Sequence, residues 1–189
     1  LGVEGGFDSK WDVTIDSQFN DLSALDARLK GQLSGIVVVQ GHEKTPALTL
    51  NLSGEALQFQ QMAVSNLSVS GTLPELGAGA GFLQLSAKNL IAANRVIPDF
   101  GLVMEGSRAD HQLTWQMEAD PVAAEGILHG ALDNDFNWQG ESQAGTVNVG
   151  DFSWQLTAPF AVNWQQLHKH ITLAPHCWLA EQAQLCSQD

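Results

Sequence analysis

The sequence predicts an all-β protein, and three observations point to this fold class. Apolar and polar residues alternate from residue 36 to residue 173, which is the pattern of strands with one buried face. Charged residues make up only 15% of the chain, against roughly 25% in an average soluble domain. The polar share is carried instead by Gln, Asn, Ser, Thr and 18 glycines. We therefore expect about a dozen strands of roughly five to seven residues, joined by turns.

One short helix is expected ahead of these strands, between residues 21 and 30. Three leucines have the spacing of one helix face: Leu22, Leu25 and Leu29. Ser23 and Asp26 stand in positions like those of a capping box, and Gly31 is a typical helix stop. The pattern predicts two to three helical turns that plug or cap the apolar end of the structure formed by the strands.

The strands that follow each contribute apolar residues at every second position, so these side chains share one face. We expect them to line the interior of the sheet. The residues in question are Leu48, Leu50, Leu52, Leu57, Phe59, Leu67, Val69, Leu83, Leu85, Leu102, Met104, Leu113, Trp115 and Met117. The alternation continues from Phe136 to Leu173.

Turns are predicted where Gly, Asn or Asp residues cluster between the alternating runs. These positions are Gly41-His42-Glu43, Ser53-Gly54-Glu55, Gly77 to Gly81, Gly106-Ser107-Arg108, Asp133-Asn134-Asp135 and Gly145. Gly-x-Leu also recurs at irregular spacing, for example at Gly71, Gly81, Gly126 and Gly130. This excludes a fixed-period repeat and indicates a quasi-repetitive antiparallel sheet.

The number of strands leaves two architectures open. A dozen strands side by side would extend roughly 55 to 60 Å, so the sheet must curl, close, or split into two layers. A closed sandwich would bury the apolar rows as an ordinary dry core. An incompletely curled sheet would leave a long groove lined by Leu, Val, Phe, Met and Trp.

Charge and composition exclude several classes of function. A formal charge of -13 and a pI near 4.6 argue against nucleic acid and anionic membrane surfaces as partners. A hydrophobic content of 44% argues against disorder. The chain carries no dinucleotide-binding, P-loop, zincin or nucleophile-elbow motif, so we expect no enzyme and no cofactor.

The two cysteines, Cys177 and Cys186, lie close together near the end of the chain. They predict one local disulfide and an oxidising compartment, and the alternative is a pair of buried free thiols. His168, His170 and His176 lie nearby and could supply nitrogen ligands to zinc. Because the cysteines are better explained as a disulfide, we expect no metal site.

The sequence resembles the TamB family, the periplasmic components of the translocation and assembly module of Gram-negative bacteria, related to AsmA-like proteins. The resemblance rests on segments spread over most of the chain, of which the Cys-Trp and Leu-Cys tail is the most specific. They are Asp21 to Leu25, Leu29 to Gly35, His111-Gln112-Leu113, Leu128 to Leu132, Trp138-Gln139-Gly140, Trp154-Gln155-Leu156, Ile171 to Trp178 and Ala183 to Cys186.

The resemblance implies a fold and a function. Members of this family carry an inner-membrane anchor, a long periplasmic stack of strands curled into a taco-like trough with an apolar concave interior, and a C-terminal region that meets the outer-membrane barrel protein TamA. Residues 1–189 would then be a single β-rich segment, a fragment of a longer repetitive periplasmic protein. Anchor and TamA contact would lie in other parts of the full-length protein.

Two functions follow from this resemblance. The first is a periplasmic bridge whose hydrophobic groove carries phospholipid between the inner and outer membranes, with acyl chains as its ligands. The alternative is a chaperone-like scaffold that assists the assembly of outer-membrane proteins such as autotransporters by adding their strands to an open sheet edge.

Overall fold

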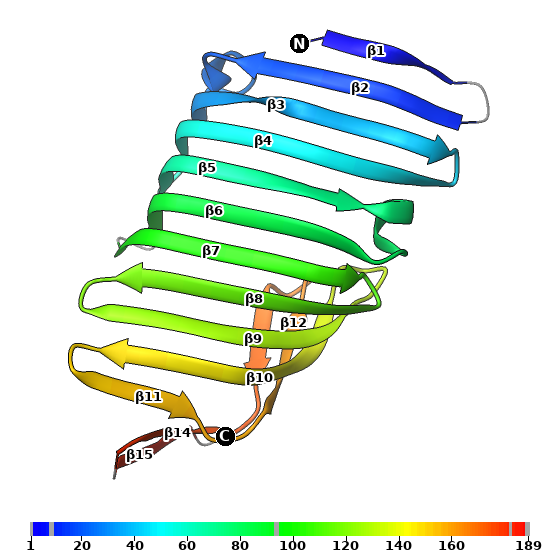
Figure 1. The fold of residues 1–189 in the computed structure, drawn as a ribbon. Helices are drawn as coiled ribbons and strands as arrows, with labels where there is room; N and C mark the ends of the chain where they lie inside the picture. The colour runs from blue at the N-terminus through cyan, green and yellow to red at the C-terminus, as the bar shows by residue number, and fades with distance from the viewer. Residues whose placement is uncertain (1, 8–9, 93–94, 182, 188–189) are drawn as a thin grey trace.

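The chain forms one open sheet of antiparallel strands (Figure 1). The computed structural model describes residues 2–7, 10–92, 95–181 and 183–187. In this part of the chain, fifteen strands follow one another mostly in sequence order. β1 does not pair with the last strands, so the sheet is not closed. The all-β, curled-sheet prediction is therefore confirmed, and the closed sandwich is excluded.

The strands and the two short 3-10 helices follow one another along the chain in this order. They are β1 (Gly2–Phe7), β2 (Lys10–Phe19), η1 (Leu22–Ala24), β3 (Leu29–His42), β4 (Thr45–Phe59), β5 (Met62–Leu73), η2 (Pro74–Gly77), β6 (Gly81–Ala92), β7 (Arg95–Ser107), β8 (Asp110–Ala119), β9 (Val122–Leu132), β10 (Trp138–Val149), β11 (Phe152–Leu156), β12 (Phe160–Gln165), β13 (His170–Leu173), β14 (Cys177–Ala180) and β15 (Ala183–Cys186).

The central strands are longer than the predicted five to seven residues, since β3 to β10 have 10 to 15 each. Two of the predicted turns lie inside strands: Ser53-Gly54-Glu55 within β4 and Gly145 within β10. Gly41-His42-Glu43 and Gly106-Ser107-Arg108 do lie at strand ends. Glycine therefore marks two different things here, the ends of strands and positions where a large side chain crosses a strand.

The helix predicted for residues 21–30 is wrong in length. Only Leu22–Ala24 is helical, as the 3-10 helix η1, and β3 already begins at Leu29. The N-terminal cap of η1 is Asp21, whose carboxylate accepts a hydrogen bond from the backbone N–H of Ser23 at 2.9 Å. Leu22 is 7% exposed and does cover one end of the sheet. None of the helices in the described ranges could cross a membrane, because all are too short.

The sheet forks at β10. β11 pairs with Thr146–Val149 of this strand, whereas β12 pairs with Trp138–Ser142. The register to β9 shifts between Ser142 and Ala144, at the position where the two branches separate. One branch continues through β14 and β15 and the other through β13. Figure 1 draws β12 behind β9 and β10.

Candidate functional site

The predicted apolar residues lie on one face of the sheet, because cross-strand partners point to the same side. Leu50, Gly71, Leu83, Met104 and Leu113 form one row across β4 to β8. Leu52, Val69, Leu85, Leu102 and Trp115 form the next row. A third row contains Gly54, Leu67, Ala87, Phe100 and Met117. We call the surface formed by these rows, with Leu48, Leu57 and Phe59, the apolar face.

All fourteen predicted residues of the apolar face are half-buried, and none is fully buried. Within the described ranges, the buried hydrophobic residues are few, and only Trp138 among them is aromatic: Val13, Leu22, Ala87, Ala124, Trp138 and Ala180. β5 to β8 pack mainly against their neighbouring strands. A half-exposed leucine has gained only part of the roughly 1.5–3 kcal/mol available from full burial. The apolar face is therefore a surface that would be stabilised by a further apolar layer.

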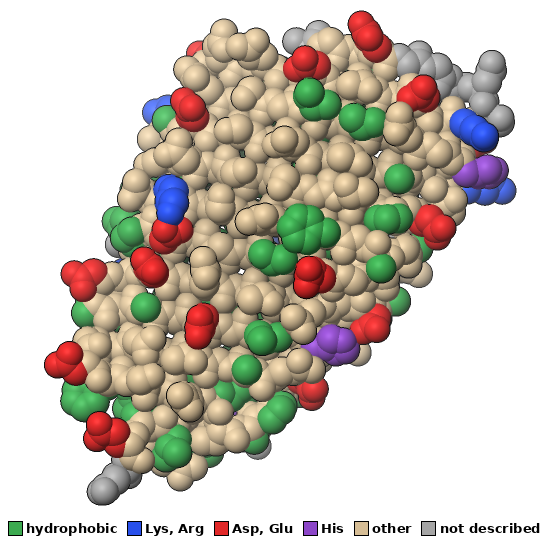
Figure 2. Space-filling model, viewed as in Figure 1, with side chains coloured by type: hydrophobic (Ala, Val, Ile, Leu, Met, Phe, Trp, Pro, Cys, Tyr) green, Lys and Arg blue, Asp and Glu red, His purple; other side chains and the backbone are tan. Residues whose placement is uncertain are grey.

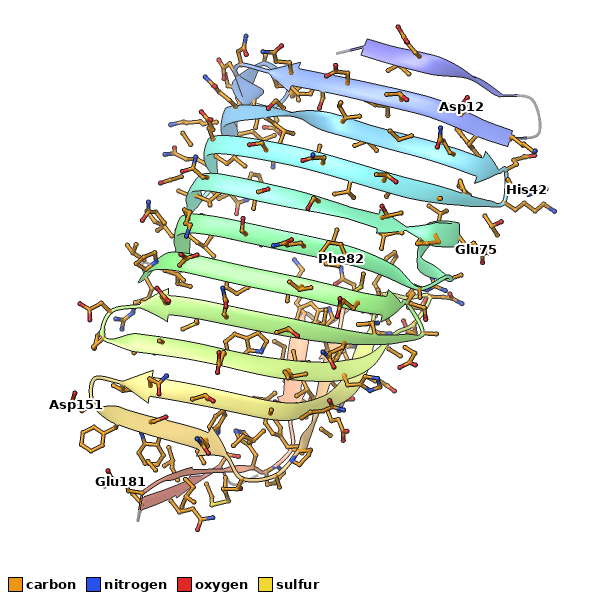
Figure 3. All side chains as sticks on the ribbon, in the orientation of Figure 1. Asp12, His42, Glu75, Phe82, Asp151 and Glu181 are labelled. Atoms are coloured by element: carbon orange, nitrogen blue, oxygen red, sulfur yellow. A yellow bond between two sulfur atoms is a disulfide. The ribbon has the colours of Figure 1, made fainter. Side chains whose placement is uncertain are left out.

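The opposite face is polar. Ser53, Ser68 and Ser86 are cross-strand partners on it, and the Thr49 and Thr72 hydroxyls lie 3.4 Å apart. Figure 2 shows this face, on which hydrophobic side chains are scattered and acidic ones lie mostly toward the periphery. Phe82, labelled in Figure 3, is one of its isolated apolar residues. The two faces thus differ in kind, as the alternation predicts.

A crease crosses four strands near one end of the apolar face. Ala56 lies between the pairs Glu55–Asn66 and Leu57–Val64, so it stands opposite Ser65. The registers continue this line through Asn89 of β6 to Pro98 of β7. Ala56 and Asn89 have positive φ angles of 49° and 50°. We define this line, Ala56, Ser65, Asn89 and Pro98, as the crease.

The inward positions change parity at the crease. In β4, Leu52 and Gly54 precede it on the apolar face, and Leu57 and Phe59 follow it on the same face. β3 keeps one parity throughout, because a bulge sets its single residue Gly31, at φ 100°, opposite both Ala56 and Leu57 of β4. In Figure 1 the ribbons of β3 to β7 bend at their left-hand ends, where the crease lies.

The bend forms a half-open cavity of about 430 Å³ between η1 and β3 to β7. Four residues of the predicted apolar face line it: Leu57, Phe59, Leu67 and Leu85. Leu22 and Leu29, which the sequence assigned to a cap over the apolar end, also line it. Sequence reasoning missed the other lining residues, namely Lys30, Gln58, Met62, Ala63, Val64, Ala87, Leu90 and Phe100. Asn89 was the one local signal of the crease in the sequence, because Asn adopts a positive φ more readily than most residues.

Beyond Trp115 the same face is occupied by aromatic side chains lying over glycines. A Cβ at Gly126 would lie 2.8 Å from Trp115 Nε1, and one at Gly145 would lie 2.8 Å from Trp178 Cη2. Gly81, Gly106, His111, Gly130 and Gly140 form one row across β6 to β10. Gly126, Gly130, Gly140 and Gly145 are therefore positions over which tryptophan rings lie.

The most buried polar group in this region is His111, which is 5% exposed. Trp138 covers Gly130 and Gly140 and donates its indole N–H to His111 Nε2 at 2.8 Å. His111 Nδ1 lies 2.9 Å from the carbonyl oxygen of Ser107. Since Nε2 accepts a hydrogen bond, Nδ1 carries the proton and donates to Ser107. Both ring nitrogens are hydrogen-bonded within the protein, which identifies His111 as a structural residue with a neutral imidazole ring.

Cys177 and Cys186 form a disulfide across the β14–β15 pair, as predicted. His176 stacks on Phe160 with ring centroids 4.0 Å apart, and its Nδ1 lies 2.8 Å from Ala174 O. Among the described residues, no group of three His, Cys, Asp or Glu is arranged to hold a metal ion. The tail residues thus serve to hold Trp178 against β10.

Comparison with known proteins gives a consistent result. The family model described as the N-terminal domain of TamB matches residues 1–189. A curated relative, the translocation and assembly module subunit TamB of Haemophilus influenzae, is 26% identical over 192 residues. That match covers 98% of this chain and 14% of the relative, so the chain spans 14% of that protein's length. No solved structure matches the chain.

Proposed function

The chain belongs to the TamB family, and we propose that its apolar face shields phospholipid acyl chains passing between the inner and outer membranes. One observation carries this proposal. Rows of Leu, Val and Met run across β4 to β8 on one face of an open sheet and stay partly exposed. A surface of this kind is unfavourable in water unless a ligand or partner covers it.

The physical basis is burial of hydrocarbon rather than specific recognition. Each methylene that moves from water onto an apolar surface contributes up to about 0.8 kcal/mol. Leu, Val and Met offer no hydrogen-bonding groups, so the rows favour any alkyl chain and leave the head group in water. This chemistry suits transfer along a surface, because no strong polar contact has to be broken at each step.

In the full-length protein we place this segment in the periplasm, anchored to the inner membrane elsewhere in the chain. The outer-membrane barrel protein TamA is the expected partner, through parts of the protein outside this segment. The name of the Haemophilus influenzae relative, a translocation and assembly module subunit, supports this setting.

The test is photo-crosslinking in full-length protein at neighbouring positions that face opposite sides. Leu85 and Leu102 lie on the apolar face, and their neighbours Gln84 and Val103 lie on the polar face. Phospholipid adducts identified by mass spectrometry are expected from Leu85 and Leu102, at least about fivefold above the two controls. Equal yields from both faces would show that the apolar face does not carry lipid.

A second function, scaffolding of outer-membrane protein strands, is supported by the open edges of the sheet. Among the strands that the structure describes, β13 pairs with β12 alone, and its Ile171 and Leu173 are 57% and 51% exposed. An edge of this kind can accept a further strand. In the same crosslinking experiment, barrel precursors trapped at Ile171 without lipid at Leu85 would favour the scaffold over the lipid conduit.

A further inference from the structure

A second hollow lies on the polar face, where the sheet continues from β10 to β12 and β13. Gln139, Asn163 and Thr172 are cross-strand partners on these three strands, so their side chains share one face. Gly140, the chain neighbour of Gln139, belongs to the apolar face, so the three side chains point to the polar side. They line a half-open cavity of about 530 Å³.

Two loops, which contribute Asn137 and Leu167 to the lining, are tied to each other beside this cavity. Asp133 accepts hydrogen bonds from the backbone N–H groups of Asp135 and Asn137 at 2.8 and 2.9 Å. Asn137 Oδ1 in turn accepts a hydrogen bond from the backbone N–H of Gln166 at 3.0 Å, in the turn between β12 and β13. The wall is thus held in place by the fold itself, so a ligand would have little chain to order on binding.

The polar groups on the floor of the cavity are open to a ligand. In the part of the chain that the structure describes, no other residue forms a hydrogen bond with the side chains of Gln139, Asn163 or Thr172. An amide offers both N–H donors and a carbonyl acceptor, and a hydroxyl donates and accepts. Among the described residues that line the cavity, none is Asp, Glu, Lys or Arg. These groups therefore match a ligand that is polar but uncharged.

A neighbouring cavity of about 390 Å³ shares Gln139 as a lining residue. Its charged groups are Asp110 and His129, which pair at 2.9 Å, and Glu141, the cross-strand partner of His129. Carboxylates accept hydrogen bonds from hydroxyl groups and repel anions. We call these two adjoining cavities the amide groove.

We propose that the amide groove binds a neutral oligosaccharide. Sugar hydroxyls act as donors and acceptors at short intervals, which suits the amides of Gln139 and Asn163 and the hydroxyl of Thr172. Leu167, which is 85% exposed beside them, offers apolar surface to the C–H face of a sugar ring. The larger cavity, at about 530 Å³, falls within the roughly 300–1,000 Å³ of small-molecule sites. This site lies on the face opposite to the apolar face and does not depend on lipid shielding.

Charge and strand position argue against two other polar ligands. An anionic glycan would meet the carboxylates of Asp110 and Glu141 at one end of the groove and no cation at the other. An extended peptide binds most readily to an open strand edge. Gln139 and Asn163 instead lie on β10 and β12, which are paired on both sides.

The test is saturation-transfer NMR on the full-length protein, with dissociation constants obtained by titration. The probes are maltotriose, tri-N-acetylchitotriose, the anionic trigalacturonate and capped tetra-alanine. At least one of the two neutral trisaccharides should bind at least about fivefold more tightly than trigalacturonate and tetra-alanine. The tighter of the two tells whether acetamido groups or hydroxyls alone are preferred.

Gln139→Ala and Asn163→Ala should each weaken binding of the neutral trisaccharide by about threefold to tenfold, because each removes hydrogen-bonding groups from the floor. The matched controls are Gln84→Ala and Asn51→Ala, the same changes at exposed positions of the polar face on β6 and β4, which should change the affinity by less than about twofold. Thr172→Val keeps a β-branched strand residue and should weaken binding by its hydroxyl alone. Circular dichroism of each variant verifies folding.

Three results would overturn the proposal. If neither neutral trisaccharide binds to folded protein, the amide groove is not a saccharide site. If one binds but the groove variants and their controls behave alike, the saccharide is held elsewhere in the protein. Tighter binding of tetra-alanine would make the groove a peptide site. None of these results bears on lipid shielding, which is tested separately by the crosslinks at Leu85 and Leu102.

Discussion

The two halves of the sheet share one antiparallel order and one alternating pattern but differ in what covers their common face. From β3 to β7 the inward side chains are mainly aliphatic and half-exposed, and they leave a cavity of about 430 Å³. From β8 to β14, Trp115, Trp138 and Trp178 lie over glycines of neighbouring strands. The aliphatic half thus leaves apolar surface uncovered, whereas in the aromatic half tryptophan rings lie over glycines.

The two halves differ in whether their apolar side chains are already buried by the fold or are left available for binding. In the aromatic half, Trp138 is 9% exposed and hydrogen-bonded, so its contribution to folding is complete without a ligand. In the aliphatic half, the exposed fraction of each leucine remains available to a bound chain. We therefore expect the aromatic half to anchor the fold and the aliphatic half to carry the ligand.

The largest expected effect comes from Gly140→Ala in the aromatic half. A Cβ at this position would lie 2.2 Å from the carbonyl oxygen of His129 and 2.6 Å from Trp138 Cη2. The new methyl group would force either the β9 backbone or the buried Trp138 ring to move. We therefore expect a loss of about 3 kcal/mol in the free energy of unfolding. Urea denaturation measures this loss.

The matched control is Gly101→Ala on β7. There the new Cβ would meet only the flexible side chain of Gln116, at 3.2 Å, and the expected change is below about 1 kcal/mol. Equal losses at Gly140 and Gly101 would contradict the view that glycine in the aromatic half makes room for tryptophan.

A smaller effect is expected from Trp138→Phe, which keeps an aromatic ring and removes the indole N–H. His111 Nε2 would then lose its donor at a buried site, at a cost of about 1–3 kcal/mol. Trp164→Phe is the control, because its N–H bonds to the exposed Gln166 at 3.2 Å. Faster amide exchange confined to β8 and β10 would locate the loss, and an equal loss in both variants would argue against a special role for the His111 pair.

The smallest effect concerns one turn in each half. Hydrogen bonds from Arg28 lower the pKa of Asp26, and hydrogen bonds from Asn137 lower the pKa of Asp133. A depressed carboxyl pKa stabilises the fold above the ordinary value near 4, and this stabilisation is lost as pH falls through the folded-state pKa. Arg28→Gln should raise the pKa of Asp26 and leave that of Asp133 unchanged, as NMR titration of the two carboxyls would show. A shift of both would mean that the turns are coupled.

Much of this arrangement follows from the sequence, because alternation alone assigns Leu50, Leu85 and Leu102 to one face. The nearby cysteines likewise predict their disulfide. The crease is different: Ala56 has no local preference for a positive φ, and only its partners on three other strands require it. Gly145 likewise reads as a turn until Trp178, far along the chain, is placed over it.

The helical spacing of Leu22, Leu25 and Leu29 misled for a related reason. Leu29 pairs with Phe59 at the start of β3, and this long-range pairing outweighs the local pattern. Leu25, left at 61% exposed, contributes little to either structure. Local spacing is a weaker guide here than the register of the neighbouring strand.

The crease also restricts how this protein can change length over generations. Deleting Ala56 alone would leave Gly54, Leu57 and Phe59 in unbroken alternation, so β4 would lose its change of parity while the adjoining strands that carry Val64 and Leu90 kept theirs. A one-residue deletion in β4 is then tolerated only with matching deletions in the adjoining strands. Insertions and deletions among relatives should therefore occur in concert at this line and singly in the hairpin turns.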